Sequence, residues 1–395
     1  MVSFADRMAH LQRSFIREIL KVAEDPSIIS FAGGLPHPGF FPVEEIAAAA
    51  QAALREGGTK ALQYATTEGY LPLREWIARR YAAQGLRVGP EQILVLNGSQ
   101  QGLDLIAKVF IDPGDSLLVE RPAYLAAIQA FGMFQPSFRS LLLEEDGVSL
   151  AELDRALRES HPKLLYAVPS FQNPSGISWS EAKRREAARL LRASGVVLVE
   201  DDPYGELRYV GEHIKPIKAF DDEGRVVYMG TFSKVLSPGL RVGWVVADPE
   251  ILKKLIIAKQ STDVCTNVLG QAIAREYMAR GLMDKQIVKI REIYGRKLKV
   301  MLDGMDEFMP EGVTWMKPEG GMFLWVTLPE GLESPSLLEK TLKEKVAFVS
   351  GRAFYPDPKD GFGTLRLNFS HPEDKLITEG LRRLGAVIEK EMASR

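Results

Sequence analysis

The sequence predicts an α/β fold: a large domain with a doubly wound, mostly parallel sheet, followed by a smaller α+β domain. Apolar runs of strand length recur through the middle of the chain, and several are apolar throughout, which is typical of strands buried on both faces. Helical patterns separate these runs, as the connections of a parallel sheet require. The chain of 395 residues also exceeds the size at which one core usually stops growing, so we expect two domains.

The elements of the large domain follow one another in chain order. We expect strands over 92–98, 115–122, 163–170, 195–202 and 225–231. We expect helices between them over 99–110, 149–160 and 179–194. The alanine-rich stretch 44–58 predicts an earlier helix that ends at glycine.

A long helical pattern over Lys285–Met305 marks a change in the chain. After it, the stretches 320–329, 346–351 and 363–370 read as strands of the smaller domain. We place the boundary near residue 285. The expected parts are an N-terminal segment 1–30 that packs with the small domain, a large domain 31–285 and a small domain 286–395.

Charge and cysteine content exclude several classes of function. A formal net charge of -2 and a pI near 6.3 give no footprint for nucleic acid, and no apolar run is long enough to span a membrane. The N-terminus lacks the apolar core of a secretory signal. Cys265 is the one cysteine, so a disulfide within the chain is impossible and we expect a cytoplasmic protein that acts on small molecules.

Polar residues gather where the predicted strands end, which is where open α/β sheets bind ligands. Ser99 and Gln100 open a helix directly after a strand and would favour an anion, although Ser99 has an equal claim to be an N-cap. Asn173 follows the predicted strand 163–170, Asp201 lies at the end of the predicted strand 195–202, and Tyr204 comes shortly after it. Acids in that position are often solvated loop residues, but one carboxylate here could face a cationic ring nitrogen.

Lys234 lies among small, apolar and hydroxylated residues between two apolar runs, which is unusual for a solvent-facing lysine. Thr231, Ser233 and Arg241 lie close to it in the sequence and would bind a phosphate. A ligand with a phosphate, a cationic ring nitrogen and a carbonyl that reacts with an amine is pyridoxal 5′-phosphate. We therefore predict this cofactor, with Lys234 bound to it; the alternative is that Lys234 is a surface lysine.

The sequence resembles the fold-type-I, class I and II aminotransferases over essentially its whole length, and within them the subgroup of α-aminoadipate and kynurenine aminotransferases. The motifs that carry the resemblance are, in order, "FAGGLPHPGFFP", "LQYATTEGYLPLR", "NGSQQGLDL", "RPAYLAAIQAF", "PSFQNPSG", "VEDDPYGEL", "GTFSKVLSPGLRVGW" and "GTLRLNFS".

The resemblance implies a role for each matching residue. Lys234 would bind the cofactor as a Schiff base and then carry the substrate's proton, Asp201 would keep the ring nitrogen protonated, and Tyr204 would hydrogen-bond the ring's 3-oxygen. Asn173 would share that bond, and Tyr124 would stack on the ring. The residues implied to hold the phosphate are Ser99, Gln100, Thr231, Ser233, Arg241 and, from a second subunit of a homodimer, Tyr64. Those implied to bind the substrate's α-carboxylate are Arg366, Gly34 and Asn173.

The substrate is less narrowly predicted than the cofactor. Arg17 matches an arginine that meets the distal carboxylate of acidic substrates in the resembling subgroup, but it could equally pair with Glu18 or Glu24 on a solvated helix. The residues expected to give apolar walls near it are Phe15, Ile16, Leu35 and Phe40. We expect amino transfer from a 2-aminoadipate-like, aromatic or branched amino acid to a 2-oxo acid such as 2-oxoglutarate, and no metal.

Two other functions use the same fold. A β-lyase or decarboxylase would use the same cofactor and align a different Cα bond with the ring. The ligand-sensing half of a transcription regulator would carry an added winged helix, and here the aminotransferase pattern begins within about twenty residues of Met1 with no basic domain before it. We expect that alternative to be the less favoured of the two.

Overall fold

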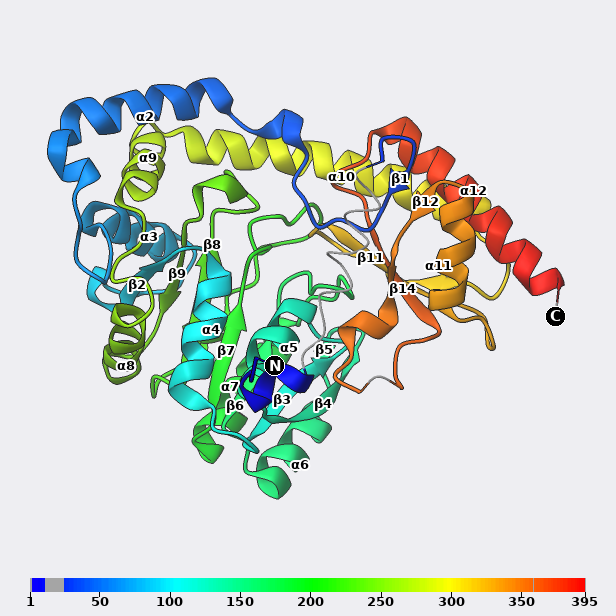
Figure 1. The fold of residues 1–395 in the computed structure, drawn as a ribbon, viewed down its shortest axis with the longest axis horizontal. Coiled ribbons are helices and arrows are strands. Elements are labelled where there is room, and N and C mark those ends of the chain that lie inside the picture. The colour runs from blue at the N-terminus through cyan, green and yellow to red at the C-terminus, as the bar shows by residue number, and fades with distance from the viewer. Residues whose placement is uncertain (1, 11–24, 358, 395) are drawn as a thin grey trace.

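The computed structural model describes residues 2–10, 25–357 and 359–394. Figure 1 shows a larger lobe built on one sheet and a smaller lobe that contains β11, β14, α11 and α12, with the long helix α10 running along one edge between them. The expected boundary near residue 285 falls close to the start of α10 (Leu282–Phe308), which continues across it. The division into domains stays a prediction.

The large sheet has eight strands in the order β2-β9-β8-β7-β6-β3-β4-β5. In that order they are β2 (Ile93–Leu96), β9 (Gly243–Val246), β8 (Val226–Thr231), β7 (Val197–Asp201), β6 (Leu164–Ala167), β3 (Ser116–Arg121), β4 (Ser137–Glu144) and β5 (Gly147–Val148). The pairs from β8 through to β4 are parallel, and β9 runs antiparallel to both β8 and β2. The predicted α/β fold class with a mostly parallel sheet is confirmed.

The strands form where the sequence is continuously apolar. Every residue of β2, β6, β7, β8 and β9 is buried, as expected for strands covered on both faces. Strand β4 is different, because most of its residues are exposed or half-buried. Since the strands from β8 to β4 point the same way, their carboxyl ends lie along one edge of the sheet.

Eleven α-helices surround the two lobes in the described chain. They are α2 (Val43–Gly57), α3 (Leu71–Ala83), α4 (Ser99–Phe110), α5 (Leu125–Gly132), α6 (Leu150–Ser160), α7 (Glu181–Ser194), α8 (Pro249–Gln260), α9 (Val268–Ala279), α10, α11 (Ser334–Lys343) and α12 (Asp374–Ala393). Helix α7 shows why they start and stop where they do: the Ser180 hydroxyl accepts a hydrogen bond from the Lys183 N–H, and Gly195 ends the helix at φ 71°. Within the described residues, no helix combines the length and apolar character that a membrane crossing requires.

The smaller lobe contains an antiparallel sheet in the order β10-β11-β14-β13. Its strands are β10 (Thr314–Trp315), β11 (Phe323–Thr327), β14 (Thr364–Asn368) and β13 (Val349–Ser350). A separate parallel pair joins β1 (Ile29–Ser30) to β12 (Val346–Ala347). The single strand predicted over 346–351 is therefore wrong, because its first half pairs with β1 and its second half with β14.

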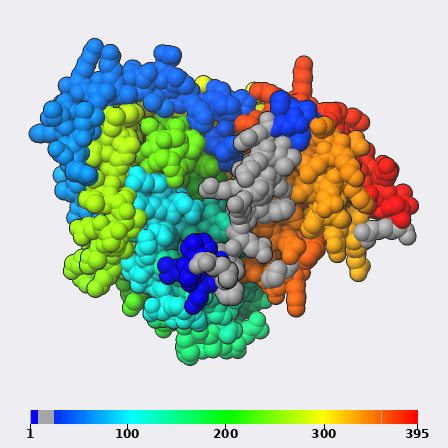
Figure 2. All heavy atoms as spheres, in the orientation of Figure 1, coloured from blue at the N-terminus to red at the C-terminus, as the bar shows by residue number. Residues whose placement is uncertain are grey.

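Figure 2 shows the molecule as spheres in the same orientation. Helix α2, in blue, lies along an outer edge of the larger lobe in both views. Apolar side chains on and just after this helix are exposed: Val43, Leu54, Leu62, Tyr64 and Leu71.

Candidate functional site

A cavity of about 300 Å³ lies at the carboxyl edge of the large sheet, between the two lobes. The predicted site residues in its lining are Gly34, Ser99, Gln100, Tyr124, Asn173, Asp201, Tyr204, Thr231, Ser233, Lys234, Arg241 and Arg366. The strand ends that were read separately in the sequence therefore converge on one space. Leu35 and Phe323 add apolar surface to it.

One end of the cavity is built to hold an anion. Helix α4 begins at Ser99, and Gly98 before it is the N-cap at φ 82°, so the alternative that Ser99 serves as the cap is wrong. The first N–H groups of this helix have no partner within it and carry the positive end of its dipole. Arg241 lies over the same turn, where its Nη2 donates to the Asn97 carbonyl at 3.2 Å. A Cβ on Gly98 would stand 2.5 Å from that Nη2, so only glycine lets the guanidinium approach.

Hydroxyl groups extend this end of the cavity. The Thr231 and Ser233 hydroxyls lie 2.9 Å apart, and the Ser233 N–H donates to Thr231 Oγ1 at 3.1 Å. Thr231 is the last residue of β8, and Ser233 comes two residues later. Hydroxyls, a guanidinium and a helix N-terminus together make a strong anion-binding set.

Asp201 ends β7 and is 3% exposed. The Tyr166 hydroxyl donates to its Oδ2 at 2.8 Å, whereas Oδ1 has no hydrogen-bond partner within the described residues. Burial raises the pKa of Asp201 to about 7, while the Tyr166 hydrogen bond opposes that rise and the neighbouring Asp202 carboxylate adds to it. A buried oxygen without a partner costs free energy, so this carboxylate favours a ligand that brings a donor or a cation.

Lys234 lines the same cavity with its side chain half-buried, and its Nζ donates to the Gly34 carbonyl at 2.8 Å. Burial lowers the pKa of this amine to about 8, and the positive charges of Arg366 and Arg241 lower it further. A large fraction of the amine is therefore neutral near pH 8. A neutral amine can attack a carbonyl carbon, which a charged surface lysine does poorly.

Arg366 comes from the middle of β14 and is 2% exposed. Its Nη1 donates to Asn173 Oδ1 at 2.8 Å and its Nη2 to the Ala32 carbonyl at 2.7 Å, while Nε has no partner within the described residues. The guanidinium lies 4.2 Å from the centre of the Phe323 ring. Burial lowers its pKa to about 10, so it stays charged at neutral pH and can hold a carboxylate.

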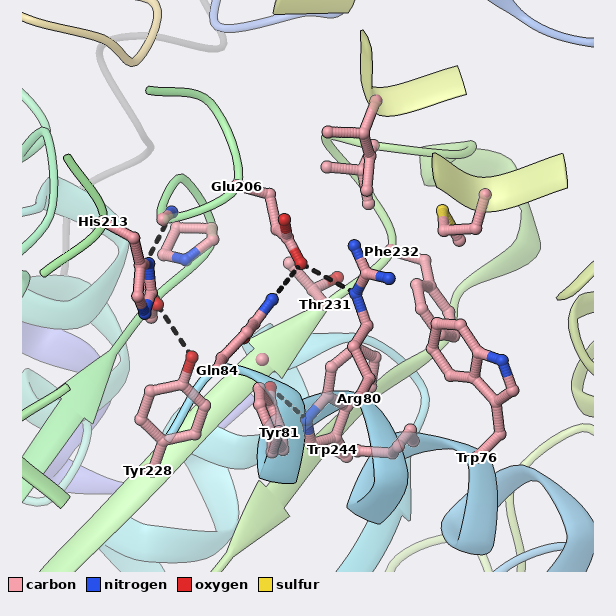
Figure 3. Close-up of a pocket in the computed structure, with 18 residues that line it drawn as sticks. Trp76, Arg80, Tyr81, Gln84, Glu206, His213, Tyr228, Thr231, Phe232 and Trp244 are labelled. Carbon is pink, nitrogen blue, oxygen red and sulfur yellow. Dashed lines mark hydrogen bonds and ion pairs between the residues drawn. The ribbon is translucent and has the colours of Figure 1, made fainter. Parts of the chain in front are cut away.

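A second, smaller cavity of about 50 Å³ is lined on one side by Asp202, Tyr228 and Gly230 (Figure 3). Five hydrogen bonds join polar groups of its lining: Arg80 Nε and Gln84 Nε2 donate to Glu206, the Tyr228 hydroxyl and the Gly205 N–H donate to Asp202, and Trp244 Nε1 donates to the Tyr81 hydroxyl. Asp202 follows Asp201 but faces this side. Because these groups already pair within the chain, this cavity makes no comparable demand for a ligand.

Some predicted residues lie elsewhere. Tyr64 is 79% exposed and does not line the cavity, and Phe40 packs against the core beside His37 and Tyr294. Leu35 does line it. Arg17, and with it Phe15, Ile16, Glu18 and Glu24, lies outside the described residues. Within the described residues, no cluster of His, Cys, Asp and Glu could hold a metal ion.

Two supports of the site, Tyr166 and Phe323, were not predicted from the sequence. Tyr166 lies in an apolar strand, and its hydroxyl had to find a partner there, so its neighbour on β7 could have been anticipated. Phe323 lies under both Arg366 and Tyr204, with its ring centre 5.9 Å from that of Tyr204. Nothing in the sequence pattern indicates that the Phe323 side chain of β11 lies against both Arg366 of β14 and Tyr204 of the larger lobe.

Comparisons with known proteins agree on one family. The family model described as aminotransferase class I and II matches residues 32–384. The aromatic-amino-acid aminotransferase 1 of Thermococcus litoralis is 46% identical, covering 98% of this chain and 94% of its own.

Two solved structures are close in fold as well as in sequence. The kynurenine aminotransferase of Pyrococcus horikoshii, in complex with PMP and its substrates, is 46% identical with a TM-score of 0.93, covering 98% of this chain and 97% of its own. The alpha-aminoadipate aminotransferase of Thermus thermophilus, complexed with N-(5′-phosphopyridoxyl)-L-leucine, is 41% identical with a TM-score of 0.92, covering 99% of this chain and 98% of its own.

In the protein without ligand, the free energy of unfolding should fall less steeply with rising pH once Asp201 is replaced by asparagine. At pH 5 the raised pKa keeps this carboxyl protonated in the folded chain, while the unfolded chain, with an ordinary value of 3.8, is ionised. Its contribution to stability is therefore present at low pH and is lost as pH rises through about 7. From pH 5 to pH 8 the wild type should lose about 3 kcal/mol more free energy of unfolding than Asp201→Asn, measured by urea denaturation. Parallel pH curves for the two proteins would refute a desolvated carboxylate at this position.

Proposed function

Because the chain belongs to the class I and II aminotransferases, we propose that the cavity around Lys234 is where it moves an amino group from an amino acid to a 2-oxo acid. One observation carries the proposal. A lysine amine with a pKa lowered to about 8 lines the same cavity as a buried Asp201 oxygen that has no partner in the described chain. The anion-binding turn and Arg366 complete the set of groups that the reaction needs.

The residues of the cavity fit pyridoxal 5′-phosphate. Asp201 Oδ1, left without a partner, suits the ring nitrogen, and Lys234 suits the carbonyl carbon. The residues that would hold the phosphate are Ser99, Gln100, Thr231, Ser233 and Arg241, and those that would contact the ring are Tyr124, Asn173 and Tyr204. When bound, this cofactor supplies an electron-withdrawing ring that stabilises negative charge at the substrate's Cα.

The chain's own residues then orient the substrate and move its proton. Arg366 would bind the α-carboxylate through its free Nε, with Asn173 and the backbone at Gly34 beside it. Lys234 would take the Cα proton and return it to the cofactor, because its pKa near 8 lets the amine both accept and donate a proton at neutral pH. Asp201 would hold positive charge on the ring nitrogen, and the hydrogen bond from Tyr166 favours its ionised form and orients the carboxylate for that task.

The relatives suggest the range of substrates. They are named for aromatic amino acids, kynurenine and alpha-aminoadipate. We propose donors of the 2-aminoadipate-like, aromatic or branched type, with 2-oxoglutarate as acceptor. In the described lining the cations are Lys234, Arg241 and Arg366, each already assigned, so a distal carboxylate would need another cation, which we propose to be Arg17.

A ¹⁵N-labelled amino donor should pass its label to the acceptor. With labelled 2-aminoadipate, phenylalanine or leucine and 2-oxoglutarate, mass spectrometry should find labelled glutamate and the donor's 2-oxo acid in equal amounts. Lys234→Ala, checked for folding by circular dichroism, should abolish the transfer. Ammonia or carbon dioxide released without any acceptor would instead favour the β-lyase or decarboxylase alternative.

We propose that the protein is a homodimer with shared active sites. Tyr64 is 79% exposed and follows α2, whose exposed apolar residues lie along an outer edge of the molecule (Figures 1 and 2). A second copy packed on this edge would bury those residues and bring Tyr64 to the partner's phosphate end.

The cytoplasmic location expected from the single cysteine also stays a proposal.

Two inactive variants, Tyr64→Ala and Lys234→Ala, should restore activity when they are unfolded and refolded together. Half of the dimers formed from an equal mixture are mixed, and each has one intact site, so about a quarter of wild-type activity should return. Mixing Lys234→Ala with Arg366→Gln is the matched control, because both residues line the same subunit's cavity and no intact site can form. No recovery in the first mixture would place Tyr64 outside the partner's site.

Arg17→Gln should lose activity selectively toward acidic substrates. A charge-assisted hydrogen bond is worth about 1.5–3 kcal/mol, so kcat/KM for 2-aminoadipate should fall about tenfold to a hundredfold. Leucine and phenylalanine should keep their kcat/KM, measured as single-turnover half-reactions so that the acidic acceptor does not enter. An equal fall for every donor would assign Arg17 a structural role.

A further inference from the structure

A buried ion pair lies behind the anion-binding end of the cavity and is not part of the cavity itself. Lys259, the penultimate residue of α8, has a side chain that is 0% exposed, and its Nζ lies 2.7 Å from Asp263 Oδ1 and 2.8 Å from Oδ2. Asp263 lies in the segment between α8 and α9 and its side chain is 20% exposed. Burying the charged amine of Lys259 is costly even beside a half-buried carboxylate, so a pair in this position needs a reason to be there.

The pair is bonded to both ends of the turn that opens α4. Asp263 Oδ2 also accepts a hydrogen bond from Asn97 Nδ2 at 2.6 Å and one from Gln101 Nε2 at 2.7 Å. Gln101 Oε1 in turn accepts from Lys259 Nζ at 3.2 Å and from the Asn97 N–H at 2.9 Å. The residues between these two anchors are 98–100, which include the helix N-cap and both α4 residues that line the cavity.

The segment that carries Asp263 is itself held against the large sheet. Val264 has φ 64°, a left-handed conformation that a β-branched residue adopts only when its surroundings enforce it. Thr266 Oγ1 donates to the Val95 carbonyl of β2 at 2.9 Å, and the Asn267 N–H donates to Asn97 Oδ1 at 3.4 Å. These contacts fix the position of Asp263 relative to the strand that leads into the turn.

We propose that Asp263, with Lys259, is a positioning residue for phosphate binding: it holds the turn 97–101 in the one shape that aims the first N–H groups of α4 and Ser99 at an anion. The proposal rests on the proposed function, because it assumes that this end of the cavity receives the cofactor's phosphate. A neutral residue at 263 would leave Lys259 buried without a counter-charge and Asn97 and Gln101 without their shared acceptor, so the turn would lose its shape.

The test compares two ligands that differ only in the phosphate. Equilibrium dialysis of the cofactor-free protein should give, for Asp263→Asn, a Kd for pyridoxal 5′-phosphate that rises about tenfold to a hundredfold, while the Kd for pyridoxal changes less than about twofold. Gln101→Met keeps both charges and removes only the hydrogen bonds that Gln101 makes to Asp263, Lys259 and the Asn97 N–H. It should therefore show a selective loss in the same direction even if Asp263→Asn folds poorly.

A matched ion pair elsewhere provides the control. Lys218 and Asp221 have side chains only 7% and 4% exposed, with Nζ 2.8 Å from Oδ2, and neither lines the cavity. Asp221→Asn should lower stability and leave the ratio of the two Kd values unchanged. If Asp263→Asn and Gln101→Met weaken the binding of both ligands equally, or weaken neither, the ratio of the two Kd values stays unchanged. That result would overturn the positioning role. A wild type that binds the two ligands equally would overturn it as well, together with the phosphate end of the proposed site.

Discussion

The rest of the site depends on one constraint: charged groups are buried at the carboxyl edge of the large sheet. In the described chain these groups lack a full set of hydrogen-bond partners. Asp201 Oδ1 and Arg366 Nε both lie buried and have no hydrogen-bond partner among the described residues. The positive charges of Arg366 and Arg241 help to lower the pKa of the Lys234 amine. A buried polar group without a partner costs free energy, and an unpaired charge costs more. The chain tolerates that cost because a ligand with a cationic nitrogen and anionic groups would relieve it at every one of these atoms.

Two supports of the same edge come from neighbouring strands. Tyr166 on β6 fixes the carboxylate at the end of β7, and Phe323 on β11 lies under the guanidinium of Arg366 on β14. Strand alternation sends Asp201 and Asp202 to opposite sides. Asp201 lines the cavity around Lys234, while Asp202 accepts a hydrogen bond from the Tyr228 hydroxyl (Figure 3). Asp201 and Arg366 are therefore held by contacts within the chain that do not depend on a ligand, as preorganised catalysis requires.

Much of this arrangement could be predicted from the sequence, because it follows from local patterns. Continuous apolar runs indicated the buried strands, and the polar residues at their ends indicated the cavity, including Asp201 and Lys234. What escaped prediction depends on contacts between distant segments: β4 is too exposed to show a strand pattern, and the segment 346–350 divides between two sheets. Lys259 and Asp263 look like an ordinary surface pair four residues apart on a helix, and only the packing of α8 beside the α4 turn buries them.

Asp201 is the residue on which the proposed chemistry depends most, because its unpaired oxygen is proposed to bind a protonated ring nitrogen. That claim is tested most directly by ¹⁵N NMR of the protein loaded with pyridoxal 5′-phosphate labelled at the ring nitrogen. The wild type should show the chemical shift of a pyridinium nitrogen across pH 6 to 9, and Asp201→Asn, which keeps the cofactor, should show that of a neutral pyridine. A neutral ring nitrogen in the wild type at pH 7 would contradict the account, because the buried carboxylate would then not be its partner.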